Sequence, residues 1–227
     1  LKKGQQYGTF WREKDNNKKL IFDFNKLTKS YKAYDVDYGE VSPNNQYISF
    51  EVDKKGNYEY DLYFKDIFND IILKDHLKRA RSMVWSNDNK TIFYTIQDSV
   101  TNRSYKVFKH ILGEDSNKDK LIYHEKDSTY NIYLDKSKSE DYIFLYSFSS
   151  DETEAQFLNA NNPNDPFKLI HKREKDHKYS IYHFKNHFYI ITNKDAINYK
   201  LIKAPVNSPK IENWEDVIRH SKTTILE

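Results

Sequence analysis

The sequence has no cysteine among its 227 residues, and it has only five glycines and five prolines. The absence of cysteine excludes disulfide bonds and thiolate metal sites. The few glycines are not clustered, which excludes the glycine-rich loops that bind phosphates and dinucleotides. No apolar run approaches the roughly 18 residues of a membrane span, and residues 1–12 contain no apolar segment typical of a signal peptide. We therefore expect a soluble protein without an export signal and without a membrane partner.

An excess of charge of one sign is also missing. The chain has 37 Lys and Arg against 34 Asp and Glu, which leaves a formal net charge of only +3. A dedicated nucleic-acid binder would have a lopsided charge, so we expect no nucleic-acid partner. Aromatic residues, by contrast, are abundant, with 19 Tyr, 14 Phe and 3 Trp. This aromatic content predicts a folded domain with a substantial core, because disordered chains contain few aromatic residues.

The dominant period of the hydrophobic pattern is two, which predicts half-buried β-strands. Short aromatic and β-branched runs with this period occupy residues 48–52, 58–64, 91–96, 105–111 and 142–146. A plausible helical turn occurs only at residues 214–218, and it is too short to decide the local structure. The sequence therefore predicts an all-β fold.

A polar turn followed by a compact aromatic strand recurs along the chain. The spacing is 44 residues from Ser42 to Ser86, 51 from Ser86 to Ser137 and 48 from Ser137 to Lys185. Repeats of about 40–50 residues with four short strands each are typical of β-propeller blades. We predict a partial β-propeller of about four to five four-stranded antiparallel blades. The predicted blades cover roughly residues 1–40, 41–84, 85–134, 135–182 and 183–227.

The sequence contains no nucleophile elbow of the α/β-hydrolase type. Such an elbow needs a serine between two glycines that are four residues apart. Only Gly4 and Gly8 have this spacing, and Gln6 lies between them. We therefore assign no catalytic residue to this chain.

The histidines suggest a metal site, since His183 and His187 are four residues apart and His177 is nearby. However, Lys185 and Asn186 more plausibly form a hairpin turn, which would place His183 and His187 opposite each other on neighbouring strands. No carboxylate that could orient these histidines is evident. We therefore assign no metal ligand and no cofactor.

Two pairs of acidic residues could in principle act as acid–base pairs, namely Glu125 with Asp127 and Glu152 with Glu154. Residues two apart on a strand share one face, and acidic pairs of this kind usually face solvent. We expect these four carboxylates to lie on a solvated face.

Basic and aromatic residues could together form a nucleic-acid platform. Acidic residues interleave with the lysines, so we expect a solvated surface instead, with the tryptophans packed in the core or between blades. The residues concerned are Lys2-Lys3, Lys18-Lys19, Lys54-Lys55, Lys172-Arg173, Trp11, Trp85 and Trp214.

Six short sequence segments, taken together, are specific to one family. They occupy residues 41–45, 84–94, 119–127, 176–180, 187–193 and 213–218. Their order and spacing resemble the propeller domain of oligopeptidase B, or protease II, in the prolyl oligopeptidase family of serine peptidases. The resemblance extends from about Gly4 to Glu227.

This resemblance implies a seven-bladed propeller that covers an α/β-hydrolase domain with Ser, Asp and His as catalytic residues. It also implies a cytoplasmic location and cleavage of short peptides after Lys or Arg. We expect the chain to end within the propeller, before the catalytic domain, and to act as a lid that limits substrates by size. We also expect an incomplete propeller to associate with itself. The alternative is a standalone propeller that binds a peptide or a protein partner.

Overall fold

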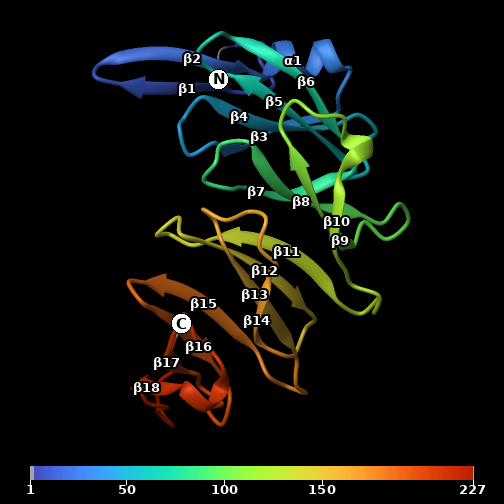
Figure 1. Ribbon diagram of the computed structural model, residues 1–227. Helices are drawn as coiled ribbons and strands as arrows, with labels where there is room; N and C mark the ends of the chain where they lie inside the picture. The colour runs from blue at the N-terminus through green and yellow to red at the C-terminus, as the bar shows by residue number, and fades with distance from the viewer. Residues whose placement is uncertain (1–2, 227) are drawn as a thin grey trace. The chain divides into compact units, whose positions relative to one another are not determined.

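The computed structural model describes residues 3–226 and is almost entirely β-structure (Figure 1). Within this range it contains eighteen strands, one α-helix and two short 3-10 helices. No helix in the described range is long and apolar enough to cross a membrane. The chain divides into two compact units, of which the first ends at His124 and the second begins at Glu125.

The first unit contains a β-hairpin, a helix and two four-stranded sheets. The hairpin consists of β1 (Thr9–Lys14) and β2 (Asn17–Asp23), and α1 (Phe24–Tyr31) follows it. The first sheet has the order β3 (Asp35–Val41), β4 (Tyr47–Asp53), β5 (Tyr60–Asp66) and β6 (Ile71–Leu77). The second sheet contains β7 (Ala80–Trp85), β8 (Thr91–Gln97), β9 (Ser104–Ile111) and β10 (Lys120–His124), with η1 (Ser116–Lys118) before the last strand.

The second unit contains two further four-stranded sheets. One is formed by β11 (Asn131–Lys136), β12 (Tyr142–Phe148), β13 (Thr153–Asn159) and β14 (Lys168–His171). The other is formed by β15 (Tyr179–Phe184), β16 (His187–Thr192), β17 (Lys200–Pro205) and β18 (Glu215–Ile218), with η2 (Ile211–Asn213) before the last strand.

Each four-stranded sheet is an antiparallel meander, in which every strand pairs with the next one along the chain. The predicted all-β fold of four-stranded antiparallel blades is confirmed, with four such sheets and one hairpin before them. The predicted limits after residues 40, 84, 134 and 182 fall inside β3, β7, β11 and β15. The repeat was counted from the polar turn. The first strand of each sheet comes before that turn, so each predicted limit falls within a first strand.

The recurring polar turn joins the first and second strands of a sheet. In three turns a buried serine (Ser42, Ser86 or Ser137) donates its backbone N–H to the carbonyl oxygen five residues later, at 2.9 Å in each case. The third residue after the serine has a positive φ, and these residues are Asn45, Asn89 and Glu140. Asparagine tolerates this left-handed conformation better than most residues. Asparagine therefore takes over at two of these corners a role that often belongs to glycine.

The helix α1 departs from the period-two pattern and was not predicted. Asp23 caps its N-terminus by accepting a hydrogen bond from a backbone N–H of the first turn (3.1 Å). Phe24, Leu27 and Tyr31 recur at helical spacing and pack against the core of the first unit. At residues 214–218, where a helical turn was plausible, the chain instead forms β18, which pairs with β17.

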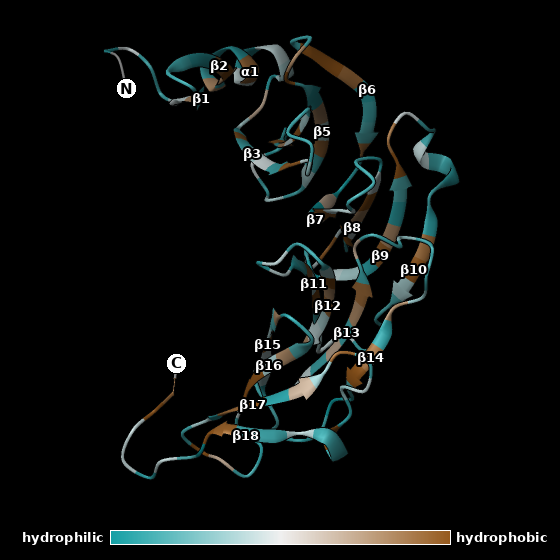
Figure 2. Ribbon diagram, turned by 60° about the vertical axis from the view of Figure 1, so that its left-hand side comes forward, coloured by the Kyte–Doolittle hydropathy of each residue, from teal (hydrophilic) through white to brown (hydrophobic). Residues whose placement is uncertain are grey.

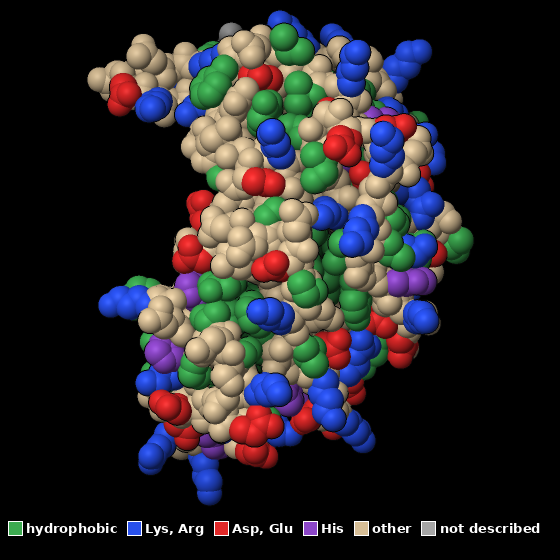
Figure 3. Space-filling view, viewed as in Figure 1, with side chains coloured by type: hydrophobic (Ala, Val, Ile, Leu, Met, Phe, Trp, Pro, Cys, Tyr) green, Lys and Arg blue, Asp and Glu red, His purple; other side chains and the backbone are tan. Residues whose placement is uncertain are grey.

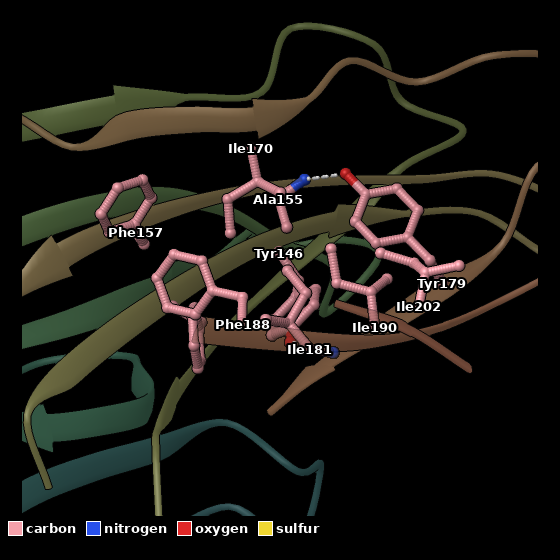
Figure 4. Close-up of a cluster of buried hydrophobic side chains, with 10 residues drawn as sticks. Tyr146, Ala155, Phe157, Ile170, Tyr179, Ile181, Phe188, Ile190 and Ile202 are labelled. Atoms are coloured by element: carbon pink, nitrogen blue, oxygen red, sulfur yellow. Dashed lines mark hydrogen bonds between the residues drawn. The ribbon is translucent and has the colours of Figure 1, made fainter. Parts of the chain in front are cut away.

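The core of the second unit lies between its two sheets and consists largely of aromatic and branched side chains (Figure 4). Phe188 is fully buried, and its ring centroid lies 5.7 Å from that of Phe144 and 4.9 Å from that of Phe157, in edge-on arrangements. The hydroxyl of Tyr179 accepts a hydrogen bond from the backbone N–H of Ala155 (2.8 Å). The tyrosine thereby ties the first strand of one sheet to the third strand of the other.

The three tryptophans have different environments. Trp85 is buried in the first unit, with its ring 5.7 Å from that of Phe64 and its indole N–H donated to the carbonyl of Glu40 (3.1 Å). Trp214 is partly buried against the core of the second unit. The predicted packing role is thus confirmed for these two residues. It is wrong for Trp11, which is 48% exposed on the terminal hairpin.

The last strand of each four-stranded sheet pairs on one side only and exposes apolar side chains, as the brown segments of β6, β14 and β18 illustrate (Figure 2). The exposed residues are Ile71, Ile72, Leu121, Leu169, Val217 and Ile218. Short edge strands limit edge-to-edge association. The strands β14 and β18 have only four residues each.

Candidate functional site

The histidines singled out in the sequence do not form one cluster. Lys185 and Asn186 do form the predicted two-residue turn between β15 and β16. Phe184 and His187 flank this turn and pair with each other, so His183 lies opposite Phe188. The expected opposition of His183 and His187 is therefore wrong by one residue, because a two-residue loop pairs the residues directly beside it.

The four carboxylates expected on a solvated face have different environments. Asp127 is exposed, whereas Glu152 and Glu154 are half-buried and Glu125 is only 5% exposed. The expectation is wrong for Glu125 because this residue precedes β11 in a connecting segment, where the alternation of a strand does not apply.

Glu125 belongs to a hydrogen-bonded network inside the second unit. Its carboxylate accepts hydrogen bonds from Arg173 Nη2 (2.5 Å) and from the Ser147 hydroxyl (2.6 Å). The Arg173 guanidinium also lies 3.9 Å from the centre of the Tyr130 ring, whose hydroxyl donates to Glu152. A buried carboxylate with these partners acts as a structural ion pair rather than as a free acid or base.

The lysine-rich pairs do not form a uniform basic patch. On the face in Figure 3, Lys and Arg side chains alternate with Asp and Glu over the whole surface. Lys18, Lys54 and Lys55 each approach an acidic side chain within 3.5 Å. Lys2 lies outside the described residues. The mixed charges agree with the predicted solvated surface, but the prediction is wrong for Arg173, whose guanidinium pairs with the buried Glu125.

A buried cluster of charged groups joins the two sheets of the first unit. His110, on β9, has no exposed surface, and its Nδ1 lies 2.7 Å from Asp119 while its Nε2 lies 3.1 Å from Asp75 on β6. The hydroxyl of Tyr94 donates to Asp119 (2.7 Å), and the backbone N–H of Gly113 donates to Asp75 (2.5 Å). Both ring nitrogens of His110 thus face carboxylates, an arrangement that suits an imidazolium with two donors.

The charge state of this cluster follows from its contacts. Burial alone would lower the pKa of His110, but the hydrogen bonds and charges of Asp119 and Asp75 outweigh it and raise the pKa to about 9. Burial would raise the pKa of Asp75, yet hydrogen bonds from His110 and from Gly113 hold it below its usual value. Burial, together with Asp119, raises the pKa of Tyr94, which remains a donor. At neutral pH, His110 is therefore a buried cation.

The stability of the protein should consequently fall in alkaline solution. The raised folded-state pKa of His110 contributes stability that is fully present below about pH 6.5 and is lost as the pH rises through about 9. A shift of this size corresponds to roughly 3 kcal/mol. The lowered pKa of Asp75 contributes stability that is present above about pH 4 and is lost in acid.

Urea unfolding between pH 6 and pH 10 would measure this effect, with a His110→Leu variant as the control. The decline through about pH 9 should occur in the wild-type protein and be much smaller in the variant. An equal decline in both proteins would show that other groups cause it.

A second group of titratable side chains lies in the connection between β14 and β15. His171 ends β14, and Glu174 and His177 follow at intervals of three residues. Nε2 of His171 lies 3.3 Å from Oε1 of Glu174, and one potential ligand atom from each of the three residues lies within 4.8 Å of the others. The other oxygen of Glu174 is paired with Lys194, and Nε2 of His177 lies 2.8 Å from the hydroxyl of Thr192.

These groups are held as two neutral imidazoles and one carboxylate. Burial lowers the pKa of His171, and burial together with the charges of His171 and Lys194 lowers the pKa of His177 to about 4. The hydrogen bond from Lys194 lowers the pKa of Glu174. Sequence reasoning named His177 but grouped it with histidines that follow it in the chain. The signal that could have revealed this group is the His-x-x-Glu-x-x-His spacing.

A groove of about 940 Å³ lies in the second unit, beside the turn between β15 and β16. Its walls include Tyr142, Phe157 and Leu169, together with Pro205 and Asn207. None of the residues of the two titratable clusters lines it.

Comparison with known families gives a match over the whole chain. Residues 1–227 match the family described as "Prolyl oligopeptidase, N-terminal beta-propeller domain". The chain is 28% identical to "Protease 2" of Moraxella lacunata over 238 aligned residues, which cover all of this chain and 34% of that protein. It is 30% identical to "Dipeptidyl aminopeptidase BI" of Pseudoxanthomonas mexicana, over 92% of this chain and 29% of that protein.

Solved structures give the same result for the fold. Oligopeptidase B from Leishmania major superposes with a TM-score of 0.85 at 25% identity, over 96% of this chain and 32% of that one. Oligopeptidase B from Trypanosoma brucei, with covalently bound antipain, gives a TM-score of 0.82 at 21% identity, over 99% of this chain and 31% of that one. The chain thus spans about a third of the length of the proteins that it resembles.

Proposed function

The chain belongs to the prolyl oligopeptidase family, whose N-terminal β-propeller domain it matches over its whole length, and on this premise we propose that it is the non-catalytic part of an oligopeptidase B-like serine endopeptidase. In this proposal a neighbouring catalytic domain supplies the chemistry, and the propeller limits access to it. The observation that carries the proposal is the match of all 227 residues to that domain, with 28% identity to a protein named Protease 2.

The state of the reactive side chains supports a non-catalytic role. His110 is enclosed by two carboxylates, and Glu125 is neutralised by Arg173. Neither group is available to accept a proton from a substrate, because each already has a charged partner in the folded protein. The chemistry of the whole protein would then depend on residues outside this chain.

The proposed gating role of the propeller follows from the size of the substrates. A folded protein cannot pass between or through two packed domains to reach a catalytic centre that they enclose, whereas a short flexible peptide can. Movement of the propeller relative to the catalytic domain would then admit substrates and release products. The short basic peptides would be partners of the whole protein rather than of this domain alone. The resemblance to oligopeptidase B is also the basis for proposing a cytoplasmic location.

Cleavage of short peptides by the protein translated from the complete reading frame tests the proposed reaction. We expect cleavage after Lys or Arg in N-terminally blocked peptides. We also expect a kcat/KM at least about 100-fold lower when that residue is replaced by Glu, because a site that pairs a basic side chain would leave its own charges unpaired. Inactivation by a serine-directed phosphonate should accompany this activity.

The blocked N-terminus distinguishes the proposal from the reaction that the name of the Pseudoxanthomonas relative describes. Cleavage only of unblocked peptides, with release of dipeptides, would favour a dipeptidyl aminopeptidase. The absence of any peptidase activity, with retained binding of a peptide or protein, would favour a standalone propeller that serves as a binding module.

A further inference from the structure

We propose that His171, Glu174 and His177 bind a divalent metal ion of the zinc class, which fastens the connection between β14 and β15. This group shares only His177 with the histidines that the sequence suggested, and the proposal departs from the expectation that the chain has no metal ligand. The inference does not depend on the proposed peptidase function. It rests on the three side chains and on the groups that orient them.

The donor set suits zinc. Two imidazole nitrogens and one carboxylate oxygen, with a fourth position for water, form a common zinc environment. The three potential ligand atoms lie within 4.8 Å of one another, and Nε2 of His171 is already 3.3 Å from Oε1 of Glu174. Tetrahedral ligands on zinc–ligand bonds of roughly 2.1 Å lie roughly 3.4 Å apart. The ligand atoms that are farthest apart would therefore need to approach by at most about 1.4 Å.

Two buried nitrogen atoms in this group have no hydrogen-bond partner. They are Nδ1 of His177 and Nε2 of His171, which lies 3.3 Å from Oε1 of Glu174 without the geometry of a hydrogen bond; the two residues are 2% and 7% exposed. A buried polar atom without a partner is costly, and coordination of an ion is one way in which a protein satisfies such an atom. A metal ion coordinated by both nitrogens would remove both costs together.

The surrounding side chains orient the ligands as those of a metal site would. A hydrogen bond from Nε2 of His177 to the hydroxyl of Thr192 would leave Nδ1 of that ring as the coordinating atom. Lys194 holds one oxygen of Glu174, and the other oxygen faces His171. Trp214 lies against both histidines, with ring centroids 5.4 Å from His171 and 6.2 Å from His177. The ligands are thus shielded on one side by an aromatic ring.

The main alternative explanation for the arrangement of His171, Glu174 and His177 is that it binds Lys194. Its ammonium already neutralises Glu174, and its charge would repel a metal ion at close range. If the three residues serve only to hold Lys194, then metal affinity should be absent. If they bind metal, then removal of the lysine charge by Lys194→Met should increase the affinity.

Cobalt(II) titration of the chelator-treated protein, followed by visible absorption, tests the proposal. We expect one equivalent of Co²⁺ to give tetrahedral bands that one equivalent of Zn²⁺ abolishes. Glu174→Gln and His177→Gln should weaken binding at least about tenfold, and Thr192→Val, which removes an orienting group, by about 10-fold to 100-fold. The matched controls His183→Gln and His187→Gln should leave the affinity unchanged.

The Glu174→Gln variant is the safer of the two ligand variants, since the Glu174 side chain is 28% exposed and its loss leaves the buried histidines in place. Circular dichroism would confirm that each variant folds. The proposal is overturned if the wild-type protein gives no tetrahedral bands. Equal zinc affinity in the wild-type protein and in the Glu174→Gln variant would overturn it as well.

Discussion

Replacing His110 by alanine should lower the free energy of unfolding by about 3–5 kcal/mol, because the change leaves two buried carboxylates without their shared cation. His110 has no exposed surface, and the Asp75 and Asp119 side chains are only 6% and 5% exposed. Bulk water therefore has little access to these two carboxylates. Equilibrium unfolding in urea, monitored by tryptophan fluorescence, measures the change.

His76, which follows Asp75 on β6, provides a matched control. Its Nε2 lies 3.0 Å from Asp61, a distance similar to those in the His110 cluster, but the two side chains are 30% and 20% exposed. A polar contact of this exposure contributes about 0–1 kcal/mol. His76→Ala should therefore have a small effect, and equal losses for the two variants would contradict the role assigned to burial.

A combined variant separates two contributions to the loss of stability: the lost attraction between His110 and the carboxylates, and the cost of leaving the carboxylate charges unpaired. Asp75→Asn and Asp119→Asn, introduced together with His110→Ala, remove both uncompensated charges. This triple variant should be more stable than His110→Ala alone, since the penalty comes from buried charges that lack a partner. A triple variant less stable than the single variant would show that the hydrogen bonds to Tyr94 and Gly113 matter more than the charges.

The strands were the part of the structure that the sequence predicted best, because alternation along a strand is a local pattern. Residues 91–96 and 142–146 were recognised in this way, and they lie within β8 and β12. The blade repeat was likewise visible, since each corner turn uses the same few polar residues. The helix α1 was missed because its eight residues were judged against a period of two rather than 3.6.

The charged clusters were less accessible to sequence reasoning, because their members lie far apart in the chain. Asp75 is 35 residues from His110, and Arg173 is 48 residues from Glu125. No local pattern indicates such pairings: the first depends on how one sheet packs against the next, and the second joins the connections before and after one sheet. The group at His171, Glu174 and His177 is the exception, since its spacing is regular and lies within one connection.

The gate should make the whole protein discriminate strongly against folded substrates. A cleavage site inside a folded protein becomes accessible only through local unfolding, which costs free energy that a short peptide does not need. Each 1.4 kcal/mol reduces the accessible population about tenfold. A site whose exposure requires about 4 kcal/mol should thus be cut about 1000-fold more slowly than the same sequence in a free peptide.

The most direct test compares one cleavage sequence in three substrates of the whole protein: a peptide of about ten residues, a disordered chain of about 100 residues, and a folded domain with the sequence in an exposed flexible loop. The exposed loop removes the cost of local unfolding, so that any remaining difference reflects access. We predict rapid cleavage of the peptide and a kcat/KM at least about 100-fold lower for the loop, because substrates that cannot enter do not reach the catalytic centre. Equal kcat/KM values for the peptide and the exposed loop would contradict the proposed role of the propeller as a gate.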